Sequence, residues 1–302
     1  MSCTERIFKI NDLELHALHW LPKHKNDSPA ILCAHGWLDN AGSFIPLAKE
    51  LCSRGYELLA FDMAGCGRSS YRALHGAYNL WDDVIDIEAL LEALGWGKYV
   101  LMGHSRGAMI ASLYAATQPK GINKLVLLDG ILPPIIETEP LAMQLSEFLS
   151  TRKKLIEKNA YVETLKEKAT NDDAKTLSMH EAWQQRQNNF PMSFEEMQPI
   201  LERGLVKVGD GYLWSHDQRV KGRSVYRMSE ADQKHLMSSL NLPGLLLLAK
   251  ESRMNKAEYI DSFRQSLPSF SIQLLDGEHH FHLQDKHFLS VANAVDKFLA
   301  TT

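Results

Sequence analysis

The chain has 302 residues, of which 45% are hydrophobic and 23% are charged, and its formal net charge is −4. These values are ordinary for a globular protein, and they exclude collagen, coiled-coil and disulfide mini-protein classes. The slightly acidic balance offers no strongly basic surface for a phosphate backbone, and the longest apolar runs, such as 242–249, are too short to span a bilayer. We therefore expect neither nucleic acid nor membrane as a partner.

The N-terminus and the cysteines suggest a reducing compartment. The first residues contain no uninterrupted apolar stretch typical of a signal peptide. The four cysteines, which form no CxxC pair, are Cys3, Cys33, Cys52 and Cys66. Scattered cysteines do not have the spacing of a zinc site, so we expect free thiols and a cytoplasmic protein.

Short apolar runs alternate with amphipathic stretches along the first 130 residues. The runs predict strands at 30–34, 57–61, 99–102 and 124–128. The amphipathic stretches predict helices at 43–54, 80–94 and 106–117. Strands that alternate with helices predict an α/β fold with a mostly parallel sheet covered on both faces.

The α/β alternation stops after about residue 130 and resumes near residue 242. Between 132 and 240 no clear buried strand is predicted, and the Lys- and Glu-rich stretch 152–175 indicates a solvated helical face. Further elements are then predicted as strands at 244–249 and 270–275 and helices near 255–265 and 286–299. The sequence thus predicts a core made of 1–130 and 242–302, with a helical cap, or lid, inserted at 131–241.

Residues 103–107, Gly-His-Ser-Arg-Gly, match the pattern G-x-S-x-G. A predicted strand precedes them and a predicted helix follows, which is the context of a nucleophile elbow. A sharp strand-to-helix turn lifts the Ser105 hydroxyl clear of the sheet, at a helix N-terminus that favours developing negative charge. The alternative is a chance match in an ordinary turn.

A serine hydroxyl needs a base to take its proton, and three histidines follow the last predicted strand. Of His279, His280 and His282, the first is predicted to be the base, because it can point back over the sheet edge. The other two are interpreted as supporting or pocket residues. The alternative is a metal cluster, but no acidic or cysteine partner has suitable spacing, so we expect no metal and no cofactor.

The carboxylate that orients the histidine is ambiguous in the sequence. The usual position follows the strand 244–249, where Glu251 and Ser252 stand and no aspartate is present. The second position is the end of the preceding strand, which supplies Asp129. We favour Asp129 and keep Glu251 as the alternative acid, although an aspartate at a strand end often only anchors a loop.

Two backbone N–H groups are needed to stabilise an oxyanion. We expect one from Arg106, which follows the nucleophile, and one from Trp37, in the loop after the strand 30–34. The Trp37 ring either lines the pocket or packs in the core. The Arg106 side chain either meets a substrate carboxylate or pairs with a structural acid.

These residues together resemble the α/β-hydrolase superfamily over essentially the whole chain. The resemblance is carried by the segments 35–40 (HGWLDN) and 62–69 (DMAGCGRS), the elbow at Ser105 and the late His279. The first of these segments and 214–219 (WSHDQR) also look like the serine hydrolase-like proteins of that superfamily. The resemblance implies an α/β-hydrolase fold with a lid, acting as a serine esterase on small or medium acyl esters without a cofactor.

Two features depart from the family pattern. Cys66 stands where the family commonly has histidine, which we expect to affect only loop structure. The absence of an aspartate near Ser252 matters more, and a similar variant of the superfamily that carries its acid after the earlier strand supports Asp129.

The function predicted from the sequence is therefore a carboxylesterase that takes a small-molecule ester and forms an acyl-enzyme. Met and aromatic residues in the cap, such as Phe190 and Met192, suit an apolar substrate, although such residues at helical spacing often form only a core. The alternatives are a C–C bond hydrolase that uses the same triad and a non-catalytic ligand-binding protein. The natural substrate and the oligomeric state are not determined by the sequence.

Overall fold

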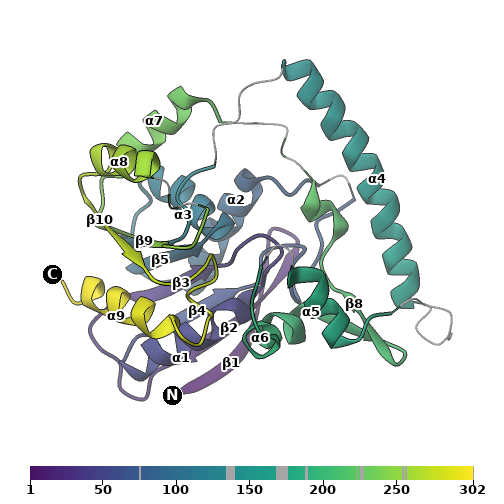
Figure 1. Cartoon of the computed structure of the whole chain (residues 1–302), viewed down its shortest axis with the longest axis horizontal. Coiled ribbons are helices and arrows are strands. Elements are labelled where there is room, and N and C mark those ends of the chain that lie inside the picture. Colours follow the sequence, from purple (N-terminus) through teal and green to yellow (C-terminus); the bar gives the residue numbers. More distant parts are fainter. Residues whose placement is uncertain are drawn as a thin grey trace.

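The computed structural model describes residues 1–74, 76–133, 140–167, 176–187, 190–222, 224, 228–253, 255 and 257–301. Within these residues, eight strands form one sheet in the order β1-β2-β4-β3-β5-β6-β9-β10 (Figure 1). The six strands β4, β3, β5, β6, β9 and β10 are parallel to one another. Strand β2 runs antiparallel to both β1 and β4. The predicted mostly parallel sheet is confirmed.

The bounds of the strands are Ser2–Ile10 (β1), Leu13–Leu21 (β2), Ala30–Ala34 (β3), Leu58–Phe61 (β4), Tyr99–His104 (β5), Ile122–Leu128 (β6), Leu205–Val208 (β7), Gly211–Trp214 (β8), Gly244–Ala249 (β9) and Phe270–Leu275 (β10). The helices are η1 (Ala41–Phe44), α1 (Ile45–Ser53), α2 (Leu80–Leu94), α3 (Arg106–Ala116), α4 (Leu141–Glu167), α5 (Met179–Gln187), α6 (Phe194–Gly204), η2 (Gln218–Lys221), α7 (Glu230–Ser239), α8 (Ala257–Ser266) and α9 (Phe288–Leu299).

The central strands are the elements that the sequence predicted best. Every residue of β3, β4, β5 and β9 is buried, as expected for parallel strands covered by helices on both faces. Helix α2 begins with a capping box formed by Asn79 and Asp82 and ends at Gly95, which has a left-handed φ of 65°. These local signals explain why the predicted bounds 80–94 are correct.

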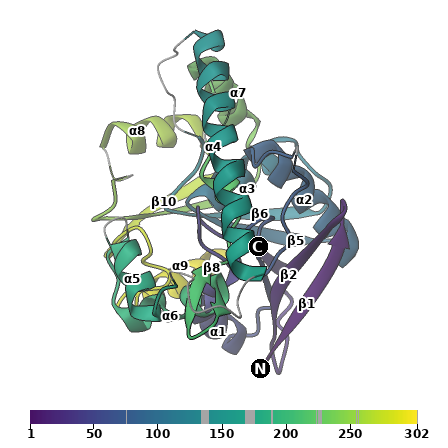
Figure 2. The same ribbon diagram turned by 90° about the vertical axis from the view of Figure 1, so that its right-hand side faces the viewer.

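Helices cover the two faces of the sheet in separate layers (Figure 2). On one face, α1 and α9 pack together, and their buried residues include Leu51 and Val295. On the other face, α2, α3 and α8 lie over a second cluster that includes Leu90 and Ile110. The two clusters hold the central strands from both sides and give the carboxyl edge of the sheet a rigid base.

Two hairpins were not predicted. Strand β1 is exposed along most of its length, so it shows no apolar run, and its pairing with β2 over residues 2–21 holds it at the sheet edge. The β7–β8 hairpin lies in the insertion, where Val206 and Lys207 are exposed. Both hairpins lack the continuous burial of the central strands β3, β4, β5 and β9.

Between β6 and β9 lie α4 to α7 with the β7–β8 hairpin, in the segment predicted as a cap. Helix α4 begins at 141, earlier than predicted, and residues 168–175 of the predicted helix lie outside the described residues. In Figure 1, α4 runs along one side of the molecule, α5 and α6 lie below it, and α7 sits near α8 on the core. A buried ion pair between Arg203 on α6 and Asp62, with a closest N–O distance of 2.8 Å, attaches the insertion to the loop after β4. No helix of the described residues is both long and apolar enough to cross a membrane.

Candidate active site

The turn between β5 and α3 holds Ser105 in a strained backbone conformation, with φ 52° and ψ −115°. Both flanking glycines are sterically required there. A Cβ on Gly103 would lie 2.4 Å from the Gly107 carbonyl oxygen, and a Cβ on Gly107 would lie 2.0 Å from the carbonyl oxygen of Ala34. The Ser105 N–H donates to the Leu128 carbonyl at 2.9 Å, which fixes the turn at the carboxyl edge of the sheet.

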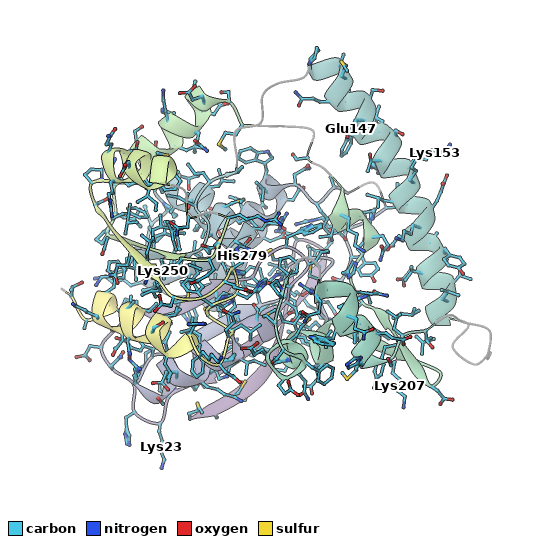
Figure 3. The ribbon with its side chains drawn as sticks, viewed as in Figure 1. Lys23, Glu147, Lys153, Lys207, Lys250 and His279 are labelled. Atoms are coloured by element: carbon cyan, nitrogen blue, oxygen red, sulfur yellow. The ribbon has the colours of Figure 1, made fainter. Side chains whose placement is uncertain are left out.

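His279 follows β10 and reaches back over this edge, where Figure 3 labels it at the centre of the molecule. Its Nε2 lies 2.9 Å from the Ser105 Oγ. Its backbone carbonyl accepts a hydrogen bond from His104 Nε2 at 2.9 Å, and its ring stacks on Phe190 with the centroids 6.3 Å apart. The side chain of His279 is 30% exposed, so a substrate can reach it.

Asp129 meets the other ring nitrogen of His279. It follows β6 with a φ of 46°, and its Oδ2 lies 2.5 Å from His279 Nδ1. The carboxylate is buried and receives two further hydrogen bonds, from the Ala249 N–H at 3.1 Å and from the Ser252 hydroxyl at 2.5 Å. Ser252 occupies the usual position of the acid, after β9. Its hydroxyl therefore donates to Asp129, which follows the neighbouring strand β6.

The structure does not bring Glu251 to His279. Its Oε2 accepts a hydrogen bond from the Gly277 N–H at 2.7 Å, which ties the loop after β9 to the loop after β10.

The loop that carries Asp129 also requires a glycine at the next position, Gly130. A Cβ on Gly130 would lie 2.7 Å from the Ser105 carbonyl oxygen, so the two loops approach as closely as glycine allows.

The two expected oxyanion donors come from segments beside Ser105. Arg106 is the first residue of α3, so its N–H has no acceptor within the helix. Trp37 precedes Leu38, which has a left-handed φ of 59°. The Trp37 ring is not packed in the core: its side chain is 40% exposed, and its indole N–H donates to the Val220 carbonyl at 3.2 Å.

The Arg106 side chain turns away from Ser105 and pairs with a structural acid. Its Nη2 lies 2.5 Å from the Asp83 Oδ2 on α2, and its Nη1 donates to the Met63 sulfur at 3.3 Å. Of the two roles considered from the sequence, the ion pair is the one that the structure contains. The guanidinium links α3 to α2.

A second aspartate–histidine pair lies directly behind His279. His280 Nε2 is 2.9 Å from Asp39 Oδ2, and Arg186 on α5 donates to Asp39 Oδ1 at 2.6 Å and to the Leu38 carbonyl at 2.7 Å. Burial opposes ionisation of Asp39, but the hydrogen bond from His280 and the charge of Arg186 hold the pKa of its carboxyl well below its ordinary value. Burial lowers the pKa of His280, so a neutral imidazole donates to an anionic carboxylate.

Asp39, His104 and His280 are also close enough to suggest metal ligands, since their ligand atoms lie within 4.8 Å of one another. However, the Arg186 guanidinium already balances the Asp39 charge, and His104 Nε2 already donates to the protein backbone. The network therefore favours a structural role. The third histidine, His282, is fully buried, and neither of its ring nitrogens has a hydrogen-bond partner among the described residues.

Two cavities meet at the site. The larger, of about 490 Å³, is lined in part by His279, Ser252 and Met192, and the smaller, of about 240 Å³, lies between the loop after β3 and the insertion. Trp37 and Phe190 line both cavities.

Three residues that shape this region were not found from the sequence: Asp39, Arg186 and Lys221. Asp39 lies in the HGWLDN segment, but no local pattern marks the other two, which lie in polar stretches of the insertion.

Comparison with known proteins gives a consistent picture. A family model described as "alpha/beta hydrolase fold" matches residues 29–286. A serine hydrolase-like protein from Danio rerio is 27% identical over 296 residues, covering 95% of this chain and 85% of the relative. Serine hydrolase-like protein 2 from Homo sapiens is 29% identical over 288 residues, covering 91% of this chain and 88% of the relative.

A solved structure is also similar along nearly the whole chain. A hypothetical protein from Pseudomonas aeruginosa PAO1 superposes with a TM-score of 0.85 at 31% identity, covering 98% of this chain and 99% of its own. The insertion and the core are therefore both included in the shared architecture.

Proposed function

The chain belongs to the α/β-hydrolase fold family, and we propose that it is a serine carboxylesterase that cleaves small to medium acyl esters through an acyl-enzyme. Ser105 is the nucleophile, His279 the general base and Asp129 the acid that orients it. The reaction needs no cofactor and no metal. The single observation that carries this proposal is the continuous hydrogen-bonded chain from Ser105 Oγ through His279 to Asp129, with steps of 2.9 and 2.5 Å.

In the first half of the reaction, Ser105 Oγ attacks the ester carbonyl while His279 Nε2 takes the hydroxyl proton. The negative charge that develops on the carbonyl oxygen is stabilised by the backbone N–H groups of Trp37 and Arg106 and by the N-terminus of α3. The proton on His279 then passes to the leaving alcohol, the carbon–oxygen bond breaks, and the acyl group remains on Ser105.

In the second half, a water molecule attacks the acyl carbonyl while His279 takes one of its protons. The same N–H groups stabilise the second tetrahedral intermediate. His279 returns its proton to the Ser105 oxygen as the acid leaves. Asp129 stabilises the charged imidazole at both stages, and its hydrogen bonds from Ala249 and Ser252 keep its carboxylate in place.

The insertion, residues 131–241, acts as the lid in this proposal. It contributes Phe190 and Met192 to the cavity beside His279, and Phe190 stacks on the catalytic ring. These side chains, with Trp37, give the cavity apolar walls that suit an acyl chain. The lid thereby selects the substrate, while the core performs the chemistry.

A fluorophosphonate probe tests the nucleophile directly. We expect intact-mass analysis to show one phosphonyl adduct on the native protein and none on Ser105→Ala, because the probe reacts only with an activated hydroxyl. Ser112→Ala is the matched control, because Ser112 is a buried serine on α3, the helix that follows Ser105. This substitution should leave labelling intact. Labelling of Ser105→Ala would refute the assignment.

A substrate panel distinguishes esterase activity from the alternatives. We expect hydrolysis of p-nitrophenyl esters of rising chain length, with no turnover of vinylogous diketones. Turnover of the diketones alone would indicate a C–C bond hydrolase. A protein that forms no adduct and hydrolyses neither class would be a ligand-binding member of the fold.

A further inference from the structure

We propose that the 240 Å³ cavity between the loop after β3 and the insertion is a subsite for a carboxylate carried by the substrate, with Lys221 as its principal cation. The inference rests on the proposed esterase function and narrows it: the preferred substrates are esters whose acyl or alcohol chain ends in a carboxylate. The cavity is lined by Trp37, Leu38 and Arg186 and by other aromatic and polar side chains of the insertion, and none of the described residues that line it is acidic.

Among the described residues that line this cavity, Lys221 is the cation that lacks a compensating charge. It is the last residue of η2, and its Nζ donates to Gln218 Oε1 at 3.2 Å. Among the described residues, no carboxylate forms an ion pair with it. Burial, together with the positive charges of Lys158 on α4 and Arg186 on α5, lowers the pKa of its ammonium group to about 8. A carboxylate placed beside Lys221 would stabilise its charged form and offset the repulsion from Lys158 and Arg186.

Arg186 contributes to the cavity in a different way. Its charge is already balanced by Asp39, and its guanidinium lies over the rings of Phe190 and Trp214, 5.2 and 5.8 Å from their centroids. Arg186 and Asp39 therefore balance each other, and the remaining positive charge at this cavity comes from Lys221, with Lys158 acting on it from α4. This positive charge favours an anionic group on the substrate.

The walls and position of the cavity connect it to the reacting ester. Trp37 and Phe190 separate it from the larger cavity that His279 lines. The Trp37 backbone is an expected oxyanion donor, and its indole N–H donates to the carbonyl of Val220, the residue next to Lys221. A methylene chain lying on these aromatic rings would lead from the Ser105 region to the ammonium group.

The neighbouring cavity has the opposite character. Its described lining residues include Glu251 and Glu278, and Arg253 is the one strongly basic side chain among them. The two glutamates would repel a carboxylate from the larger cavity, whereas Lys221 would attract it to the smaller one. The charges on the two sides therefore orient an ester that carries one free carboxylate.

The test compares mono-p-nitrophenyl esters of glutaric, adipic and suberic acids with analogues in which the free carboxylate is a carboxamide. The two series have nearly the same shape and differ in charge. Rates measured with Ser105→Ala provide the background for reaction without the nucleophile. We expect kcat/KM for the best carboxylate ester to exceed that of its carboxamide by about tenfold or more, because the carboxylate, unlike the carboxamide, forms a charge-assisted hydrogen bond with the Lys221 ammonium group.

Substitution of the lysine should remove this preference. In Lys221→Gln the ratio of the two kcat/KM values should fall to about one, because the carboxylate ester loses its partner charge. Lys221→Arg should keep the preference, since it keeps the charge. Lys207→Gln, an exposed lysine on β7 that Figure 3 shows far from His279, is the control and should leave the ratio unchanged.

The pH dependence of the ratio of kcat/KM for the carboxylate ester to that for the carboxamide ester provides a second measurement. This pH dependence would not change if Lys221 had only a structural role. Both esters share Ser105 and His279, so the ionisation of the triad cancels in the ratio. The preference for the carboxylate should decline above about pH 8 as Lys221 loses its proton, and in Lys221→Arg it should persist. Among the described residues, the other titratable groups that line the cavity are His216 and Arg186, and the charge of Lys158 acts on Lys221 from α4.

The outcomes separate this inference from the proposed function. If both ester series are hydrolysed at equal rates, and Lys221→Gln changes neither, the carboxylate subsite is wrong while the esterase stands. If neither series is hydrolysed faster than by Ser105→Ala, and the probe does not label Ser105, the esterase itself is wrong. A preference that survives in Lys221→Gln would also overturn the role of Lys221.

Discussion

Two aspartate–histidine pairs lie side by side in this protein, and they differ in what surrounds them. His279 binds Asp129 and faces Ser105, and 30% of its side chain is exposed. His280 binds Asp39 at a similar distance, but its side chain is only 3% exposed, and the pair is completed by Arg186 rather than by a hydroxyl.

The comparison teaches that the residue types alone do not define a catalytic pair. An imidazole acts as a base when it is oriented by a carboxylate and can reach both a hydroxyl and the substrate. His280 is almost fully buried and lies beside no hydroxyl, and Arg186 balances the charge of its partner Asp39, so we expect this pair to stabilise the two loops that it joins. We therefore expect changes at the Asp129 pair to affect the reaction and changes at the Asp39 pair to affect stability.

The largest effect is expected from Asp129→Asn. An amide does not hold His279 in the tautomer that accepts the Ser105 proton, so kcat should fall by about 10⁴-fold. Steady-state kinetics with a p-nitrophenyl ester measures this, and thermal unfolding should show that the fold is kept. Glu251→Gln is the matched control, with a far smaller expected loss. A severe loss in Glu251→Gln beside a mild one in Asp129→Asn would reverse the assignment of the acid.

Asp39→Asn should produce the opposite pattern. Removing the carboxylate leaves the Arg186 guanidinium buried without its counter-charge, which costs about 3–5 kcal/mol in the free energy of unfolding. Urea unfolding measures this cost. At a temperature where the variant is folded, the fluorophosphonate probe should still label Ser105. An unchanged free energy of unfolding would show that the second pair is not a stabilising one.

The last comparison concerns stability in mild acid. Burial lowers the pKa of four histidines, His35, His104, His280 and His282, so the folded protein binds fewer protons at these rings than the unfolded chain does. The free energy of unfolding should therefore fall as the pH drops below about 6.5, the imidazole value of the unfolded chain.

His282→Leu isolates one of these groups. It should reduce the slope of unfolding free energy against pH by at most about 1.4 kcal/mol per pH unit, the value for one proton, which is approached only well below pH 6.5. Urea titrations at pH 7 and pH 5.5 measure both slopes. Equal slopes in the variant and the native protein would contradict the account of buried neutral histidines.

Most of the α/β core was predictable because its signals are local. The strand 30–34, the helix 80–94 with its stop at Gly95, and the glycines around Ser105 each depend on neighbours within a few residues. Strand β1 and the β7–β8 hairpin were not predictable in this way. Their backbone pairing supports them, and their exposed side chains lack the apolar pattern of a buried strand.

The sequence by itself determined the serine turn and indicated the first of three histidines, because a nucleophile elbow is a short pattern between a strand and a helix. It left Asp129 and Glu251 as competing acids and gave no sign of Arg186 or Lys221 as neighbours of Trp37. Only the tertiary structure decided which carboxylate lies beside His279 and which cations share a cavity. The reason is physical: these contacts join residues about 35 to 180 positions apart, and residue types along a chain do not specify distances that long-range packing sets.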